Sequence, residues 1–246
     1  MSVPTAVKDH IQQLGGAFMF SREAKDYARE VGVEGFIGPY MRGRAGVLGD
    51  VDADVVTAAV GFFPADAVRA AWESVPVPAA TAAAAYARAA QNFGRRKLAG
   101  FTESDRLAEL LRAVVDNGDV AGVPLFAGWR AVPLPEDGPG RVLQLTHTLR
   151  EQRGGLHFVA TYAGGLTPMQ AVLIGGSPMA DGATQAKMYG WQEPFPEITD
   201  ELRARWNQAE ELTDTLVGPA FDVLSAREGE ELVTLLAQAH TTVFRR

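Results

Sequence analysis

The sequence predicts a mainly α-helical fold that contains two helix-turn-helix halves in tandem. Apolar side chains recur at helical spacing in many segments, as they do between Leu107 and Val114. Glycine pairs and prolines separate these segments, and Ser, Thr or Asp precedes several of them in the position of a helix cap. A helix over 156–163, a glycine turn and a second helix opened at Pro168 form the pattern of a helix-turn-helix.

The first quarter of the chain predicts several short helices. Residues 1–20 predict a helix and turn broken at Gly15-Gly16, and Ser21 predicts the cap of the next helix. Asp50, Asp52 and Asp54 lack the Gly and Glu that an EF-hand loop needs, so they predict capping of a helix rather than a calcium site. The short helices are expected over 22–31, 36–44, 55–63 and from Pro64 to about Trp72.

Longer helices are expected after a proline-rich linker at 75–78. The loop over 133–140 is the best candidate for an internal boundary, and the Gly-, Pro- and Ser-rich stretch over 177–196 predicts a loop or wing. Ser225 and Glu228 have the spacing of a capping box for the last helix. The longer helices are expected over 81–92, 104–116, 122–132, 199–215 and 226–240.

The two halves of the chain resemble each other weakly. Residues 51–60 follow a glycine turn and lead to Trp72, and residues 166–174 follow a glycine turn and lead to Trp191. Such similarity indicates a tandem repeat. We therefore expect a first helix-turn-helix half over 1–75, a helical linker region over 76–140 and a second half over 141–246.

The composition is that of an ordinary soluble globular protein, with 47% hydrophobic and 22% charged residues among 246. Cysteine is absent, which excludes disulfides, cysteine-zinc sites and thiol nucleophiles. The first residues contain no apolar signal core, and glycines and prolines interrupt the uncharged stretch over 154–180. We therefore expect a cytoplasmic protein without membrane spans. The net charge of −7 provides no general attraction for nucleic acid.

A dense polar cluster directly precedes and enters this uncharged stretch. It contains His147, Arg150, Glu151, Arg153 and His157 within eleven residues. Residues three or four apart lie on one side of a helix, so several of these side chains are neighbours. We expect the glycine pair after Arg153 to end this helix and His157 to begin the next. The alternative is a solvated Arg/Glu helix with an ordinary C-cap.

The cluster supports three functional hypotheses. In the first, Arg150 and Arg153 bind an anionic small molecule while Glu151 orients one of them, and Arg44 and Tyr40 from the first half complete the site.

In the second, His147, Glu151 and His157 hold a metal ion as a set of two histidines and one carboxylate. In the third, His157 is an acid/base group in a pocket. No residue pattern names a reaction, so whether the protein is an enzyme, and with which cofactor, stays open.

The cluster also resembles the hallmark of an actinobacterial family of helix-turn-helix proteins, close to Leu-Arg-Glu-His-Arg-Gly-Asp-Gly-His. Two further segments are similar to that family, one from Gly43 to Gly49 and one from Gly122 to Ala127. The resemblance implies two winged-helix-like halves with short β wings, similar to MarR-type domains. The hallmark matches at Leu149, Arg150, Glu151, Arg153, Gly154 and His157, and it departs at Gln152, Gly155 and Leu156.

Neither candidate recognition helix is suited to DNA. The helix opened at Pro168 has only Gln170 as a polar side chain, and three aspartates lead into the helix of the first half. We therefore expect weak DNA binding or none, with a ligand-responsive transcriptional regulator as the alternative. The uncharged stretch should be buried, either in the chain's own core or in a homodimer interface that includes Met169, Leu173 and Ile174.

Overall fold

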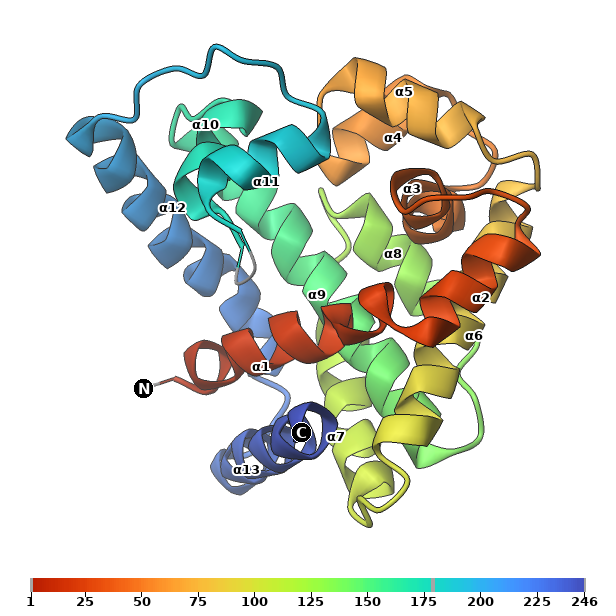
Figure 1. Ribbon diagram of the computed structural model, residues 1–246. Helices are drawn as coiled ribbons and strands as arrows, with labels where there is room; N and C mark the ends of the chain where they lie inside the picture. Colours follow the sequence, from red (N-terminus) through yellow and green to blue (C-terminus); the bar gives the residue numbers. More distant parts are fainter. Residues whose placement is uncertain (1, 178–179, 246) are drawn as a thin grey trace.

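The computed structural model describes residues 2–177 and 180–245, and it confirms a mainly α-helical protein (Figure 1). Over these residues the chain forms thirteen α-helices and three short 3-10 helices. In chain order they are α1 (Val3–Ala17), η1 (Phe18–Phe20), α2 (Arg22–Glu30), α3 (Ile37–Ala45), η2 (Gly46–Leu48), α4 (Ala53–Val60), α5 (Ala65–Glu73), α6 (Ala79–Lys97), α7 (Ser104–Asn117), α8 (Pro124–Ala131), α9 (Gly138–Ala163), α10 (Pro168–Gly175), α11 (Gly182–Tyr189), α12 (Asp200–Val217), η3 (Gly218–Phe221) and α13 (Ala226–Phe244).

Helix α9 is the centre of the molecule (Figure 1). It packs against α1, α6, α7, α8 and α12, so its side chains contact neighbours from most of the chain. Its apolar face, predicted from Leu143, Leu145 and Leu149, is buried. Because α9 is enclosed on most sides, its polar residues need partners from other helices.

The predicted end of this helix at Gly154-Gly155 was wrong. Helix α9 continues through both glycines for 26 residues, and neither has a positive φ. A Cβ on Gly155 would lie 2.7 Å from the Val123 side chain. Glycine is therefore required here for the close approach of a neighbouring segment, which sequence spacing alone does not distinguish from a helix cap.

The break predicted at Gly15-Gly16 was wrong for the same reason. Helix α1 runs through this pair to Ala17. A Cβ on Gly15 would lie 2.6 Å from the backbone oxygen of Thr146 in α9. The two helices therefore cross at close range, and this crossing brings the polar side chains of α1 to the polar cluster of α9.

The predicted helix-turn-helix is present at the end of α9. The helix ends at Ala163, the next begins at Pro168, and a bend of 114° separates them. Thr167 and Gln170 form a capping box at the start of α10. This geometry agrees with the crossing of roughly 90–120° that is usual for the motif.

The predicted β wings are not found in the described part of the chain. Over residues 2–177 and 180–245 the only pairing of extended residues is a single bridge between Ser177 and Ala180. The segment expected to form a wing instead forms α11, which the Asp181 side chain caps and Gly190 ends in the left-handed conformation. Asp181 is a signal for a helix start and Gly190 for a helix end, but the many Gly, Pro and Ser residues around them led to the prediction of a loop or wing.

No single helix in the described ranges is both long and apolar enough to cross a membrane. Helices α9 and α10 satisfy that test only when taken together, across the bend between them.

One hydrophobic cluster includes side chains from the N-terminal to the C-terminal helices, from Val7 to Val243. It contains residues from all three predicted regions, whose boundaries at 75 and 140 stay a prediction, as does the tandem repeat. The uncharged stretch over 154–180 is buried only in part, because Ala171 and Val172 are covered whereas Tyr162 is 73% exposed. A homodimer interface at this stretch stays a prediction.

Candidate anion-binding site

A cavity of about 490 Å³ lies beside the middle of α9, between α1, α3 and the helices from α10 to α12. Five of the seven predicted site residues line it, while Glu151 and His147 lie beneath its wall, almost fully buried. The five are Tyr40, Arg44, Arg150, Arg153 and His157. The structure thus brings together residues from both predicted halves of the chain.

Glu151 is the buried carboxylate on which two arginines meet. Arg44 donates to it from Nε at 3.0 Å and from Nη2 at 2.8 Å, and Arg150 donates from Nη1 at 2.9 Å. Burial alone would raise the pKa of Glu151, but the two guanidinium groups outweigh this effect and lower the pKa to about 2. Glu151 is therefore ionised, and the set carries two positive charges against one negative charge.

The two arginines of this set are not equivalent. Arg44 uses its remaining nitrogen, Nη1, to donate to the Tyr40 hydroxyl at 3.0 Å, and Glu151 raises its pKa against the opposing effect of burial. Arg150 lines the cavity, and its buried Nε has no hydrogen-bond partner among the described residues. Arg150 is thus the member of the set with an unused donor.

A second ion-pair set lies one turn further along α9. Arg153 donates from Nη2 to Glu210 at 2.8 Å and to Asp214 at 3.2 Å, and Lys8 pairs with Asp214 at 3.0 Å. These four side chains carry two positive and two negative charges. The carboxylates that Arg153 requires therefore come from α12, within the chain itself.

His147 occupies an aromatic enclosure beneath the first set. Its ring packs edge-on against Phe18, Tyr86 and Trp129. Because a carbonyl oxygen only accepts, the Nδ1–H of His147 donates to Gly15, at 3.2 Å. Burial lowers the pKa of His147 to about 4 although the carboxylate of Glu151 partly opposes this, so the ring is neutral at pH 7.

His157 belongs to the second set. Its Nδ1–H donates to the Thr213 hydroxyl at 3.0 Å, because that hydroxyl itself donates to Ala209. Its Nε2 lies 3.6 Å from Glu210. Burial lowers the pKa of His157, and the carboxylate of Glu210 opposes this shift. Its role as an acid/base group stays a prediction.

The geometry does not support the predicted metal site. His147 and Glu151 approach each other to 4.0 Å, but His157 is ten residues from His147 on one continuous helix, which corresponds to roughly 15 Å. Within the described ranges, no group of three His, Asp or Glu side chains has the arrangement of a metal site. The sequence hypothesis depended on a turn after Gly155 that would have folded His157 back.

Several cavity residues were missed in the sequence. Lys8 and Gln12 come from α1, Phe62 and Phe63 from the turn after α4, and Trp206 from α12. They lie far from the cluster along the chain and share no spacing with it. Only the crossing of α1 over α9 and the packing of α12 bring them to the cavity.

A family model described as a helix-turn-helix family matches residues 5–246. No curated protein and no solved structure matches the chain. The similarity to MarR-type domains and the actinobacterial origin stay predictions. Since the match extends over nearly the whole sequence and the structure contains the α9–α10 motif, this chain belongs to that helix-turn-helix family.

Proposed function

We propose that this helix-turn-helix protein binds a small anionic molecule, with a carboxylate or phosphate group, in the cavity beside α9. Arg150 is the principal ligand-binding residue, because it lines the cavity and, among the described residues, pairs with one carboxylate, Glu151, which it shares with Arg44. A guanidinium suits an anion of this kind because its planar donors match two acceptor oxygens.

The observation that carries the proposal is the charge balance around Glu151. Two guanidinium groups face one carboxylate there, and the Nε of Arg150 lacks a partner within residues 2–177 and 180–245. A buried group with unused charge and donors is costly unless something pairs with it. A bound anion would supply one negative charge and accept from Arg150.

The rest of the cavity indicates what the anion is attached to. Phe62, Phe63 and Trp206 add apolar side chains to its lining. A volume of about 490 Å³ is within the usual range for small-molecule pockets. We therefore expect an organic acid or organic phosphate with an apolar body rather than a bare inorganic ion.

Thermal unfolding with benzoate and phenyl phosphate as probes tests this function. Either probe should raise the melting temperature above that in chloride at equal ionic strength, because a ligand that binds the folded state stabilises it. Arg150→Gln should remove the increase. The matched control is Arg205→Gln, since Arg205 forms an exposed pair with Glu201 outside the cavity. An equal increase in the wild type and Arg150→Gln, or none in the wild type, would contradict the proposal.

A ligand-responsive transcriptional regulator is the second candidate, because the α9–α10 bend has the geometry of a DNA-binding motif. The charges argue against strong binding. The Gln170 side chain accepts from Thr167 in the capping box, and Arg95 and Arg96 at the end of α6 pair with Asp137 and Glu23.

We expect weak or no binding to DNA at physiological salt, because α10, the candidate recognition helix, has no Lys or Arg to displace counterions. Fluorescence anisotropy with random duplexes and with the DNA upstream of its own coding sequence measures this. Nanomolar affinity for the latter would establish the regulator instead.

A further inference from the structure

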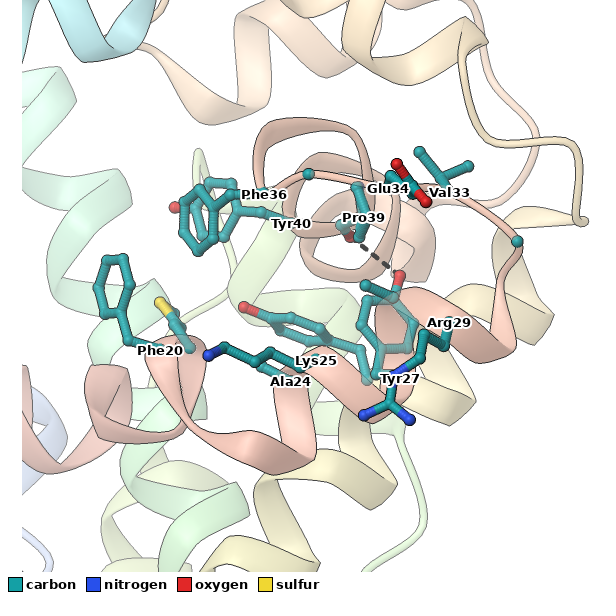
Figure 2. A pocket seen from close by; sticks show the side chains of 15 residues that line it. Phe20, Ala24, Lys25, Tyr27, Arg29, Val33, Glu34, Phe36, Pro39 and Tyr40 are labelled. Carbon is teal, nitrogen blue, oxygen red and sulfur yellow. Dashed lines mark hydrogen bonds between the residues drawn. The ribbon is translucent and has the colours of Figure 1, made fainter.

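A second cavity, of about 670 Å³, lies between η1, α2 and the start of α3. Figure 2 shows side chains from these three segments facing a common space. Its lining is mostly apolar and aromatic, in contrast to the arginine-lined first cavity. Among the described residues, Tyr40 alone lines both of them.

Three rings form one wall of this second cavity. Phe20 and Phe36 stack with centroids 4.9 Å apart and planes 7° apart, and Phe36 and Tyr40 stack at 5.3 Å and 16°. Phe20 is 55% exposed and Phe36 is 38% exposed. An exposed stack of flat aromatic rings is a surface against which another flat ring packs favourably.

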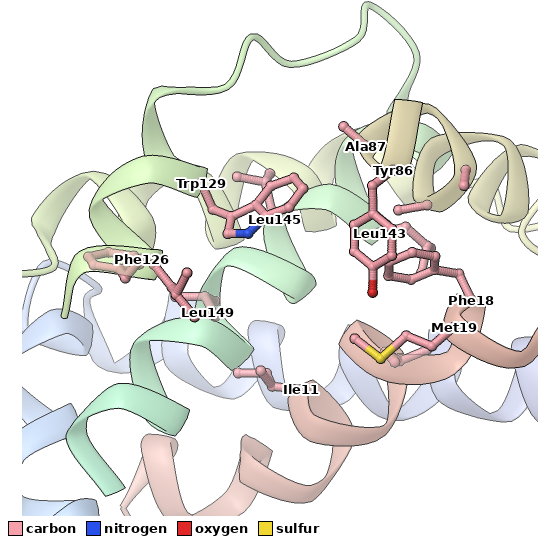
Figure 3. Packing of buried hydrophobic residues seen from close by; sticks show 14 of the residues in the cluster. Ile11, Phe18, Met19, Tyr86, Ala87, Phe126, Trp129, Leu143, Leu145 and Leu149 are labelled. Atoms are coloured by element: carbon pink, nitrogen blue, oxygen red, sulfur yellow. The ribbon is translucent and has the colours of Figure 1, made fainter. Parts of the chain in front are cut away.

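The inner end of the cavity carries one polar group with an unused donor. Tyr86 lines the cavity but is only 2% exposed, and its hydroxyl has no hydrogen-bond partner in the described ranges. Figure 3 shows this hydroxyl pointing toward Met19, another lining residue. Burial raises the pKa of Tyr86 well above its usual value, so the hydroxyl keeps its proton and can donate it.

The other polar groups of the cavity do not require a ligand. The Tyr27 hydroxyl donates to the Pro39 backbone oxygen at 2.9 Å (Figure 2). Arg29 pairs with Asp26, and Lys25 and Glu34 at the rim are exposed and opposite in charge. The interior therefore favours an uncharged molecule that supplies a single acceptor.

We propose that this second cavity binds a neutral, flat aromatic molecule whose hydrogen-bond acceptor, such as a ketone oxygen, accepts from the Tyr86 hydroxyl. The aromatic body packs along the wall of Phe20, Phe36 and Tyr40. This site is separate from the proposed anion site, and among the described residues the two sites share Tyr40 alone. A ligand of this class would cover the exposed rings and would accept a hydrogen bond from the buried Tyr86 hydroxyl.

The probe for this site is 6-propionyl-2-(dimethylamino)naphthalene, a neutral aromatic ketone whose emission reports on polarity and hydrogen bonding. The full-length protein should bind it saturably. Tyr86→Phe, which removes only the hydroxyl, should weaken binding by roughly 3–10-fold, as expected for one hydrogen bond, and should shift the bound emission to shorter wavelength. Because Tyr86→Phe removes an unpaired buried group, its melting temperature should not fall.

Two further variants locate the probe. Ala24→Phe places a ring in the cavity from α2 and should abolish binding, and Phe36→Ala removes part of the aromatic wall and should weaken binding at least about 10-fold. The matched controls are Tyr162→Phe and Phe244→Ala, because both side chains are exposed and neither lines the cavity. These controls should bind the probe as the wild type does.

The proposal is overturned if the wild type shows no saturable binding, or if Tyr86→Phe and Ala24→Phe bind the probe like the wild type. If Arg150→Gln loses the probe while Tyr86→Phe, Ala24→Phe and Phe36→Ala keep it, the probe binds in the first cavity, and this result would also overturn the proposal. Failure of benzoate and phenyl phosphate to stabilise the protein leaves this outcome unchanged, so the two proposals are tested independently.

Discussion

Two ion-pair sets lie one helical turn apart on α9 and differ in their balance of charge. Around Glu151, Arg44 and Arg150 share one carboxylate, whereas Arg153 and Lys8 pair with two carboxylates of α12, those of Glu210 and Asp214. The first set has an excess of positive charge and the second has none. This difference in charge balance is the reason that we propose Arg150, and not Arg153, as the ligand-binding arginine, although both belong to the same sequence motif.

The sets also differ in burial. The side chain of Glu151 is 0% exposed and that of Arg44 is 10% exposed, whereas Glu210 and Asp214 are 31% and 23% exposed. Charges away from water depend more strongly on their partners. Loss of the Glu151 carboxylate should therefore have the largest effect on stability.

Glu151→Gln should have the largest effect. It leaves two arginines facing each other without their carboxylate, and breaking a buried ion pair typically costs roughly 3–5 kcal/mol. Urea unfolding at pH 7 measures the loss, with Glu211→Gln as the control because Glu211 is exposed on α12. A loss below about 1 kcal/mol would contradict the burial of Glu151 as an ion pair with the two arginines.

A fall in pH should lower the free energy of unfolding through His147, whose ring lies beneath the first ion-pair set. The pKa of His147 is lowered from 6.5 to about 4 by burial, so between these values the unfolded chain binds a proton that the folded protein excludes. The free energy of unfolding should fall on the order of 3 kcal/mol as the pH falls from about 6.5 to about 4, and should not depend on His147 above that range.

His147→Asn provides the comparison, because its amide can still donate to Gly15. Denaturant unfolding between pH 4 and pH 7 should give a flatter profile for this variant. The Glu151 carboxyl, whose pKa is lowered to about 2 by the two arginines against the effect of burial, contributes stability that is lost only below about pH 4.5. If wild type and variant have parallel profiles above pH 4.5, His147 is not the source.

Arg153→Gln and Arg150→Gln compare the two sets directly. Arg153→Gln should lower the free energy of unfolding by about 1–2 kcal/mol, since its partners are partly exposed, and should keep anion binding. Arg150→Gln should cost less than about 1 kcal/mol, because Arg44 still neutralises Glu151, but should abolish anion binding. Melting and ligand titration of both variants measure the contrast, and the opposite pattern would assign the ligand to the second set.

The smallest expected effect concerns the glycine pair after Arg153. A Cβ on Gly154 meets nothing within 4 Å, so Gly154→Ala should stabilise α9 by about 0.5–1 kcal/mol. Gly155→Ala should instead destabilise the protein, because its Cβ would meet Val123 at 2.7 Å. Thermal unfolding compares the two, and equal effects would indicate that α9 does not continue through this pair as described.

The sequence alone determined the helical class and many helix ends. Local signals decide these features, because capping residues act on backbone groups three positions away and a helical period is visible within a few turns. The predicted box at Ser225 and Glu228 is confirmed, as is the capping of α4 by Asp52. The polar cluster beside the first cavity was also singled out from its spacing and from the family hallmark.

Only the tertiary structure decided what each glycine pair does and which partner each charge takes. Gly165 and Gly176 have positive φ and lie where helices end, whereas Gly15 and Gly155 lie inside helices at close crossings. Glycine tolerates both environments, so local sequence does not distinguish them. Likewise, Arg44 and Glu151 are 107 residues apart. The partner of a buried charge depends on which helices pack together, and that is a property of the whole chain.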